Sequence, residues 1–336
     1  MATLYKELPN RAFPHEVDEL DISTSNETKV ELRYNGKTMF SSNLFPIDGK
    51  IELRDIASLL DSYLSEDLCT FEVWLDDAAA DSTDIIPCRV RLDCNADDMD
   101  SVFLTRTTEK YTHRYAQDFI PCYKVTSDLL YAEIIIRNRE SGEVTMVSEK
   151  GNVSASGIIE LDCSGFFDSI DEHYPGYDIV QYTVELGKSK ITHRVIPDGM
   201  ADNLHDFGFI NSFNQREHIT LMGAASRDMK VERRSAIIGG QYRNFDVESV
   251  PYWTIKSGMM LDGMAGLFDD LISATKVWRL ADDVQMAVTD SEFKNPDDNA
   301  SACQGSVTLR ETKRKYRHHV TKQVRTFDIT FDETFQ

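Results

Sequence analysis

The chain has 336 residues, of which 41% are hydrophobic, and its formal net charge is −21. This length and apolar content exclude wholesale disorder and a single small core, and they predict two or three folded domains. The negative charge argues against a general binder of nucleic acid or anionic membranes, because such binding needs a basic surface.

No targeting or metal-binding pattern stands out. The N-terminal segment has no apolar stretch of signal-peptide length, and no later stretch reaches the roughly 18 apolar residues of a membrane span. We therefore expect a protein made in the cytoplasm without a signal peptide and without membrane insertion. The six cysteines form no CxxC pair and no zinc spacing, so we expect them to be reduced and partly buried, with no metal or other cofactor.

The first domain is predicted over residues 1–85 and is rich in strands. Apolar and polar residues alternate over 30–34 and run into Asn35-Gly36, a dipeptide that favours the positive backbone angles of a type I′ turn. We therefore expect a hairpin whose return strand covers residues 38–43.

A short amphipathic helix is predicted to follow. Apolar residues fall at helical spacing over 56–64, and Asp55 stands at the position of an N-cap. Strand alternation resumes over 71–75. The small and acidic segment 76–86 is predicted to be a loop that leads into the next domain.

The middle domain, residues 86–172, is predicted to resemble a β-sandwich. Its strands are separated by Asn, Asp, Gly and Ser, which are typical of turns in sandwiches and barrels. The predicted strands cover residues 89–92, 102–105, 132–137, 144–148 and 156–161.

The C-terminal domain, residues 173–336, is predicted to be β-rich with one short helix. Alternation predicts one hairpin over 180–195 and another over 230–247, which turns at Gly239-Gly240. Helical spacing predicts a helix over 264–274. Further strands are predicted over 277–280, 284–288, 307–311 and 325–331. The expected fold class is mainly β, with several small β-sandwich or barrel-like domains in series and one or two short helices packed on sheets.

Motifs of known chemistry are weak or missing in the sequence. The residues GKS at 187–189 resemble the end of a phosphate-binding loop, but Tyr182 stands where that loop needs glycine. No GxSxG or HExxH motif occurs. His205, Asp206 and His218 form a faint cluster that we interpret as structural or surface residues. We therefore expect no enzyme, and a hydrolase with a dispersed carboxylate site is kept only as a third hypothesis.

The stretch VTDSEFKNPDDN, residues 288–299, concentrates oxygen-bearing side chains. An EF-hand register that starts at Asp290 or at Asp297 does not place oxygen ligands and glycine where calcium needs them. A looser calcium site stays open as an alternative. We favour a long solvated connection that follows a strand ending at Val288, with Phe293 tucked under it as an apolar anchor.

Basic side chains concentrate near the C-terminus of this acidic chain. Alternation along a strand would bring several of them to one face, which fits either a solvated hairpin or an interface to the acidic face of a neighbouring subunit. Nucleic-acid binding is the weaker interpretation because of the net charge. These candidate interface residues are Arg310, Lys313, Arg314, Lys315, Arg317, Lys322 and Arg325.

Trp253 and Trp278 are candidate aromatic contacts. Both lie in strand-like contexts, so the simplest interpretation is that they are core or interface residues. An aromatic ring can also serve as a platform for a sugar, which gives an alternative function as a carbohydrate-binding or adhesin-like β-sandwich protein.

The order of the C-terminal elements resembles that of a known class of protein. The segments RSAIIGGQYRNFDVESVPYWTIKSGMMLDGMAGLFDDLISATKVWRL, MAVTDSEFKNPDDN and SVTLRETKRKYRH are similar to tail-associated structural proteins encoded in phages and prophages of Bacteroides-type bacteria. The N-terminal VELRYNGKTMFSSNLFPIDGKIELRDIASLLDSYL resembles the opening domain of those proteins. The resemblance covers about two-thirds of the chain, and residues 86–172 contribute little to it.

The resemblance implies a virion protein of the tail tip or baseplate and no catalysis, and it supplies no site residues. We therefore predict a non-enzymatic structural protein located in the tail of the virion. Its expected partners are copies of itself, in a ring-like homo-oligomer, and other phage tail or baseplate proteins.

Overall fold

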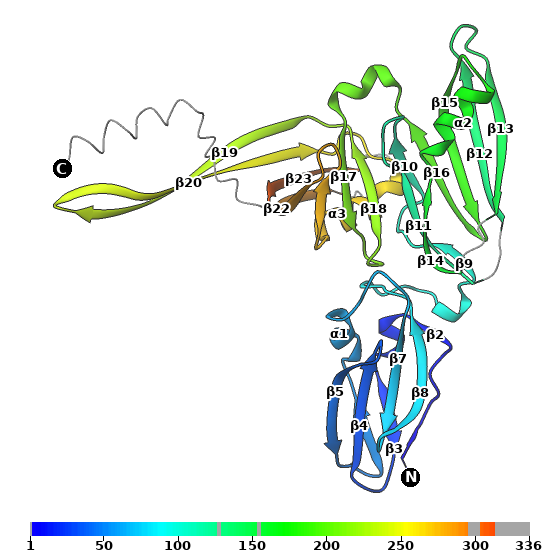
Figure 1. Cartoon of the computed structure of the whole chain (residues 1–336), viewed down its shortest axis with the longest axis vertical. Coiled ribbons are helices and arrows are strands. Elements are labelled where there is room, and N and C mark those ends of the chain that lie inside the picture. Colours follow the sequence, from blue (N-terminus) through cyan, green and yellow to red (C-terminus); the bar gives the residue numbers. More distant parts are fainter. Residues whose placement is uncertain (1, 126–128, 153–155, 295–302, 313–336) are drawn as a thin grey trace, which may run out of the picture.

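The structure, a computed structural model, describes residues 2–125, 129–152, 156–294 and 303–312. These residues form five β-sheets with three short α-helices between them (Figure 1). The predicted fold class, mainly β with several separate sheets, is confirmed. Among the described residues, no helix is long and apolar enough to cross a membrane.

The N-terminal unit folds around one apolar core. Its elements are β1 (Thr3–Leu4), β2 (Arg11–Ala12), η1 (Pro14–Val17), β3 (Leu20–Ser23), β4 (Thr28–Tyr34), β5 (Lys37–Leu44), β6 (Lys50–Leu53), α1 (Ile56–Asp61), β7 (Cys69–Leu75) and β8 (Ala78–Ile85). The two sheets have the orders β2-β8-β7-β4-β5 and β1-β3-β6. Asn35 and Gly36 adopt φ angles of 49° and 72°, so the predicted turn between β4 and β5 is confirmed.

The prediction of a loop over residues 76–86 is wrong. Residues 78–85 form β8, which pairs with β7 along its length. Asp76 and Asp77 adopt φ angles of 49° and 63° and turn the chain back on itself. Aspartate tolerates this left-handed conformation better than most residues, which explains how an acidic stretch makes a tight turn.

The prediction that the Asp55 side chain caps α1 is also wrong. Asp55 adopts a φ of 62°, and its side chain makes no capping hydrogen bond. The backbone N–H of Ala57 instead donates to Oδ1 of Asp18, 2.9 Å away. A residue distant in sequence therefore caps the helix, and the spacing of residues next to the helix does not reveal it.

The middle unit packs a larger sheet against a smaller sheet and one helix. Its elements are η2 (Ala96–Asp98), β9 (Ser101–Phe103), β10 (Glu109–Thr112), β11 (Phe119–Lys124), β12 (Leu129–Asn138), β13 (Val144–Asn152), β14 (Gly157–Asp162), α2 (Gly165–His173), β15 (Tyr177–Leu186) and β16 (Ser189–Val195). The sheets have the orders β10-β16-β15-β12-β13 and β14-β11-β9. Ile134 and Ile136 of the larger sheet pack in one core with Phe167 of α2 and Ile120 of the smaller sheet.

Two predictions about this unit need correction. The boundary predicted at residue 172 falls inside it, because β15 pairs with β12 and β16 pairs with β10. The sheet therefore continues to Val195. Residues 89–92 were expected to be a strand but form none, and the N–H of Arg89 bonds to the carbonyl of Ser212 at 2.7 Å.

The C-terminal unit is one sheet with a helix. Its elements are η3 (Asp198–Asn203), β17 (His205–Ile210), β18 (Arg216–Leu221), β19 (Ala225–Ile238), β20 (Gln241–Lys256), η4 (Asp262–Met264), α3 (Ala265–Ser273), β21 (Val277–Arg279), β22 (Val284–Lys294) and β23 (Gln304–Glu311). The sheet order is β18-β17-β21-β22-β23-β20-β19. The predicted helix is confirmed, and its Leu267, Phe268 and Leu271 are fully buried in the core. The strand predicted over 325–331 lies outside the described residues.

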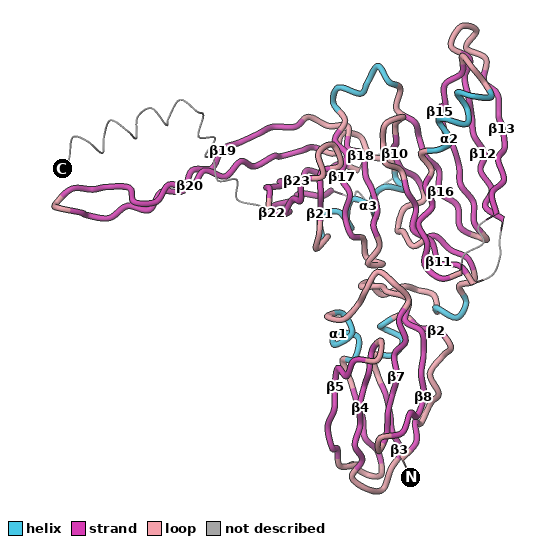
Figure 2. The backbone as a smooth tube through the Cα atoms, in the orientation of Figure 1, coloured by secondary structure: helices cyan, strands magenta, loops and turns pink. Residues whose placement is uncertain are grey.

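The three units give the molecule an open outline. In Figure 1 the N-terminal unit lies below the other two, the middle unit lies on one side, and the hairpin of β19 and β20 projects from the opposite side. The smooth tube in Figure 2 shows the two strands of this hairpin running far beyond the rest of their sheet. Its predicted turn is confirmed, since Gly239 and Gly240 have φ angles of 61° and 80°.

Candidate functional site

Five polar side chains meet in the interior where three sheets join. Lys110 of β10, Tyr182 of β15, His193 of β16 and His218 of β18 surround Asp118, which lies just before β11. We call these five residues the buried polar cluster. Each side chain belongs to a residue that is at most 1% exposed.

Asp118 is the centre of the buried polar cluster. Its Oδ1 lies 2.8 Å from Lys110 Nζ and 3.4 Å from His218 Nδ1. Its Oδ2 accepts a hydrogen bond from the Tyr182 hydroxyl and lies 3.5 Å from His193 Nε2. The rings of Tyr182 and His193 stack, with centroids 4.4 Å apart. One carboxylate therefore links strands of the middle unit to β18 of the C-terminal unit.

Burial and charge set the protonation of these groups. Burial alone would raise the pKa of Asp118, but His193, which is protonated in the acid range where Asp118 titrates, and Lys110 hold it well below its usual range. Burial would lower the pKa of Lys110, but the Asp118 carboxylate raises it above its usual value. Burial lowers the pKa of His193 to about 3, so this ring is neutral at pH 7. Asp118 and Lys110 therefore form an ion pair in a dry interior.

Accessibility decides what the buried polar cluster can do. Lysine, aspartate, histidine and tyrosine all serve as acids and bases in enzymes. Here the five residues are closed from solvent, so a substrate has no path to them in this conformation. A paired buried charge is costly to break, at about 3–5 kcal/mol when one partner is removed. The arrangement suits a rigid polar joint between sheets.

Polar contacts continue outward from the cluster along β18. His218 Nε2 lies 3.3 Å from Thr220 Oγ1, which donates to Asp206 at 2.6 Å. Asp206 also lies 2.7 Å from His113 Nε2. The sequence suggested a cluster of Asp206 and His218, and the structure joins these two through Thr220. His205 does not enter this chain of contacts among the described residues.

A second buried acid lies on the other face of β18. Glu217 is 1% exposed and accepts hydrogen bonds from Thr105 and from Asn211, whose Nδ2 lies 2.7 Å from Glu217 Oε2. Burial raises the pKa of Glu217 to about 7. The junction between the middle and C-terminal units is thus unusually rich in buried polar groups.

Sequence analysis missed this joint, although one signal was present. His193 and Ile191 are two residues apart on β16 and therefore share one face of the strand, and both are buried. Its strand partner across the ladder is Tyr182. A histidine on the apolar face of an alternating strand therefore marks a polar group in the core, but it does not name the partners.

The two candidate tryptophans are half-buried and lie against arginines. The guanidinium groups of Arg227 and Arg279 lie over the Trp253 ring, 5.2 and 5.3 Å from its centroid. Arg216 lies over Trp278 at 5.4 Å. Cation–π contacts of this kind occupy ring surface that a sugar would need. The geometry therefore does not favour the carbohydrate-binding alternative.

Only one of the candidate basic interface residues falls in the described part of the chain. Arg310 is exposed on β23, where it lies opposite Tyr252 and Ala287. It stays a candidate. The other six, Lys313, Arg314, Lys315, Arg317, Lys322 and Arg325, lie outside the described residues.

The stretch that begins at Val288 is more regular than predicted. The strand does not end at Val288, because β22 continues to Lys294 and pairs with β23. Phe293 packs against Phe268 with ring centroids 5.3 Å apart, so its role as an apolar anchor is confirmed. No group of three or more metal-ligating side chains occurs among the described residues, and residues 295–302 lie outside them.

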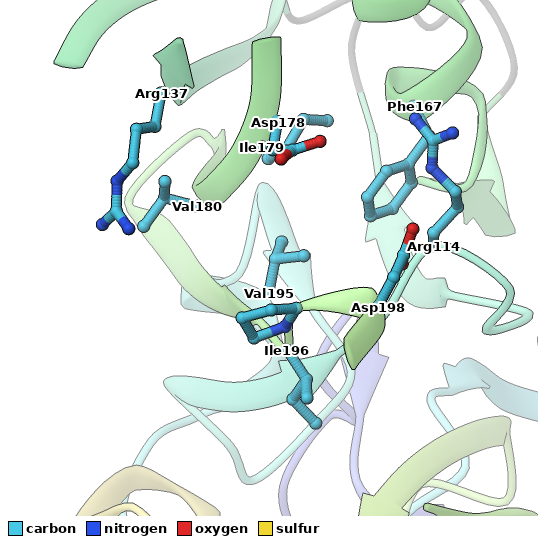
Figure 3. Close-up of a pocket in the computed structure, with 10 residues that line it drawn as sticks. Arg114, Arg137, Phe167, Asp178, Ile179, Val180, Val195, Ile196 and Asp198 are labelled. Atoms are coloured by element: carbon cyan, nitrogen blue, oxygen red, sulfur yellow. The ribbon is translucent and has the colours of Figure 1, made fainter. Parts of the chain in front are cut away.

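A small hollow of about 210 Å³ opens beside β15 and β16 of the middle unit. Figure 3 shows Phe167 and Arg114 on one side of it and Arg137 with Val180 on the other. Asp171 holds Arg114 in an ion pair at 2.6 Å. The hollow contains none of the residues of the buried polar cluster. Its lining combines charged side chains with apolar ones.

The projecting hairpin is the most unusual surface of the molecule. We define the arm as residues 229–251, which lie beyond Tyr252, the outermost residue of β20 that pairs with β23. Its two strands pair with each other, and no third described strand joins them. On β19, the described side chains are exposed on both faces except that of Ala236, which is half-buried. The arm therefore stands away from the core.

One face of the arm carries four exposed apolar residues around Arg233. Met229, Val231 and Ile237 alternate along β19, and Tyr242 lies opposite Ile237 on β20. Their exposed fractions are 45%, 37%, 64% and 81%. We call these four residues the apolar face of the arm. Strand residues spaced by two share a face, so the intervening Lys230 and Arg234 lie on the opposite face.

Comparison with known proteins adds no relative to this description. No protein-family model matches the chain, and no curated protein matches it.

Proposed function

We propose that this chain is a structural subunit of a phage tail tip or baseplate, located in the virion, that acts by assembling with copies of itself and with other tail proteins. No catalytic role is part of the proposal. One observation carries it, namely the apolar face of the arm, which the rest of the described chain leaves exposed. The resemblance of the N-terminal and C-terminal segments to tail-associated proteins supplies the biological setting.

The energetics of the arm favour a partner. An isolated two-stranded ribbon is at best marginally stable in water. The arm extends such a ribbon over more than twenty residues, 229–251, and keeps Tyr242 at 81% exposure. Burying a large apolar side chain completely contributes about 1.5–3 kcal/mol. Covering this face on another subunit would therefore stabilise both the arm and the assembly.

The buried polar cluster supports the same function. A component of a large particle must present its contact surfaces at fixed angles, and this requires a rigid body. The ion pair of Asp118 and Lys110, 2.8 Å apart, ties β10 to the start of β11, and Asp118 also lies 3.4 Å from His218 of β18. A shift between these strands would leave a buried charge unpaired, so the contacts resist it.

The test is to shorten the arm. Asp228 and Tyr252 are directly paired, so a two-residue Asn-Gly turn can join them in place of residues 229–251. The wild-type chain should form a defined oligomer as concentration rises, and the shortened chain should stay monomeric in light scattering with unchanged thermal unfolding of the body. Particles assembled with only the shortened chain should lack complete tails. A wild-type chain that stays monomeric, and particles whose tails are intact without it, would refute the proposal.

A further inference from the structure

We propose that the arm of one copy adds edge to edge to strand β13 of a second copy, with its apolar face beside Val144 and Met146. This inference rests on the proposed function, since it names the acceptor surface for self-assembly. The acceptor is defined by Val144 and Met146 of β13 together with the acidic turn that precedes the strand.

Strand β13 presents an open edge. It is the outermost strand of the order β10-β16-β15-β12-β13, and no other described strand pairs with its outer side. Val144 and Met146 share one face of the strand and are 56% and 62% exposed. Open edges with exposed apolar residues are templates for the addition of further strands from another chain.

The acidic turn before β13 has the charge opposite to that of Arg233 on the arm, and it lies next to Arg137, an exposed basic residue paired with Val144. Glu140 and Glu143 are exposed in the turn between β12 and β13, and neither forms an ion pair with another described residue. Arg233 lies on the same side of β19 as Val231 and Ile237, is exposed, and likewise forms no ion pair with another described residue. Seating the arm on β13 would bring this guanidinium next to the acidic turn.

The placement of the two surfaces argues for a head-to-tail contact. Figure 1 shows the arm projecting from one side of the molecule and β13 lying at the opposite side. Each copy would therefore donate an arm at one side and accept an arm at the other. Such a heterologous contact builds a ring when the rotation between copies closes, and a filament when it does not.

Two other acceptors fit less well. A symmetric contact between two arms through their apolar faces would bring Arg233 of each copy toward its counterpart, which places like charges together. Tyr5, Phe45 and Ile47 are 71–79% exposed and form a second set of apolar residues, in the N-terminal unit. Phe45 and Ile47 lie in the connection after β5 and not along an open strand edge.

A charge exchange tests the contact directly. Association of the full chain is measured by sedimentation over a range of concentrations. Arg233→Glu alone and Glu143→Arg alone should each weaken association by at least about tenfold, which corresponds to 1.4 kcal/mol, because each places like charges together. The double variant should recover association to within about threefold of the wild type.

Edge variants test the apolar part of the same contact. Met146→Lys should also weaken association by at least about tenfold, because a lysine on an open edge blocks the addition of a strand. The matched control is Ser41→Lys, since Ser41 is exposed on β5, the edge strand of the N-terminal sheet. This control should associate like the wild type. Every substituted residue is exposed, so circular dichroism should show an unchanged fold.

The outcomes separate this inference from the proposed function. If shortening the arm abolishes association while Met146→Lys and the charge exchange have no effect, the arm binds elsewhere and the β13 acceptor is overturned, but self-assembly stands. If Phe45→Lys disperses the oligomer and Met146→Lys does not, the N-terminal apolar residues are the acceptor. If the wild type is monomeric under all conditions, the self-assembly part of the proposed function fails as well.

Discussion

Two buried ionisable residues near the joint, Glu217 and His193, should make stability depend on pH in opposite directions. Burial raises the pKa of Glu217 from 4.5 to about 7, so the folded state keeps a proton that the unfolded state releases. This contribution to stability is complete below pH 4.5 and is lost as the pH rises toward 7. Burial lowers the pKa of His193 from 6.5 to about 3, so its contribution rises with pH between these values. The two effects offset each other between pH 4.5 and 6.5.

Glu217→Gln should remove the contribution of Glu217 to the pH dependence of stability. The amide carries no proton to release, so the free energy of unfolding of the variant, relative to the wild type, should increase with pH between 4.5 and 7. One protonation equilibrium changes the free energy of unfolding by about 1.4 kcal/mol per pH unit. Urea denaturation at several pH values measures the difference.

The matched control for this experiment is Glu140→Gln. Glu140 is exposed in the turn between β12 and β13, so the substitution should leave the pH dependence of unfolding unchanged. A constant difference between Glu217→Gln and the wild type across this pH range would show that burial does not shift the titration of Glu217.

At the scale of elements, the sequence predicted correctly the turns whose geometry depends only on the residues within them. The Asn35-Gly36 and Gly239-Gly240 turns are correct because glycine and asparagine adopt positive φ at little cost. The strand β8 was missed because its Ala, Asp and Ser residues lack strand preference, and pairing with β7 overrides it. The boundary predicted at residue 172 falls inside a sheet because β15 pairs with β12, although β13, β14 and α2 lie between them in the chain. Composition does not encode such a non-local pairing.

The helix α1 shows how a distant residue replaces an expected local one. Asp18→Ala should destabilise the N-terminal unit by about 1 kcal/mol, because it removes the acceptor of the Ala57 N–H at 2.9 Å. Asp55→Gly should be neutral or stabilising, since Asp55 holds a φ of 62° that glycine adopts more easily. Thermal unfolding of the two variants compares them. A larger loss for Asp55→Gly than for Asp18→Ala would restore Asp55 as the effective cap.

The buried polar cluster and the projection of the arm escaped prediction for different reasons. The buried polar cluster brings Lys110 and Asp118 together with His218, which is about a hundred residues further along the chain, so only the folded structure reveals it. The hairpin of the arm was predicted, but not its projection. Alternation of Met229 and Val231 with charged residues is the same pattern that a strand packed on a core would have.

For the whole molecule, the proposed assembly leads to a prediction about the arm, which should become more ordered when a partner covers it. The body is held by apolar cores and by the ion pair of Asp118 and Lys110. Among the described strands, those of the arm, residues 229–251, pair only with each other. Hydrogen bonds of such a ribbon open easily in the monomer and are protected only when a partner covers them.

Hydrogen exchange at two protein concentrations tests this implication. In dilute protein, amides of residues 229–238 should exchange much faster than those of Phe207 and Phe209 in the buried strand β17. At concentrations that favour assembly, the arm amides should slow markedly while those of β17 do not change. Raising the salt concentration should partly reverse the protection, because it screens the charges of Arg233 and its acidic partner. Equal protection of the arm at both concentrations would mean that the ribbon is stable without a partner, and the energetic reason for assembly would then be lost.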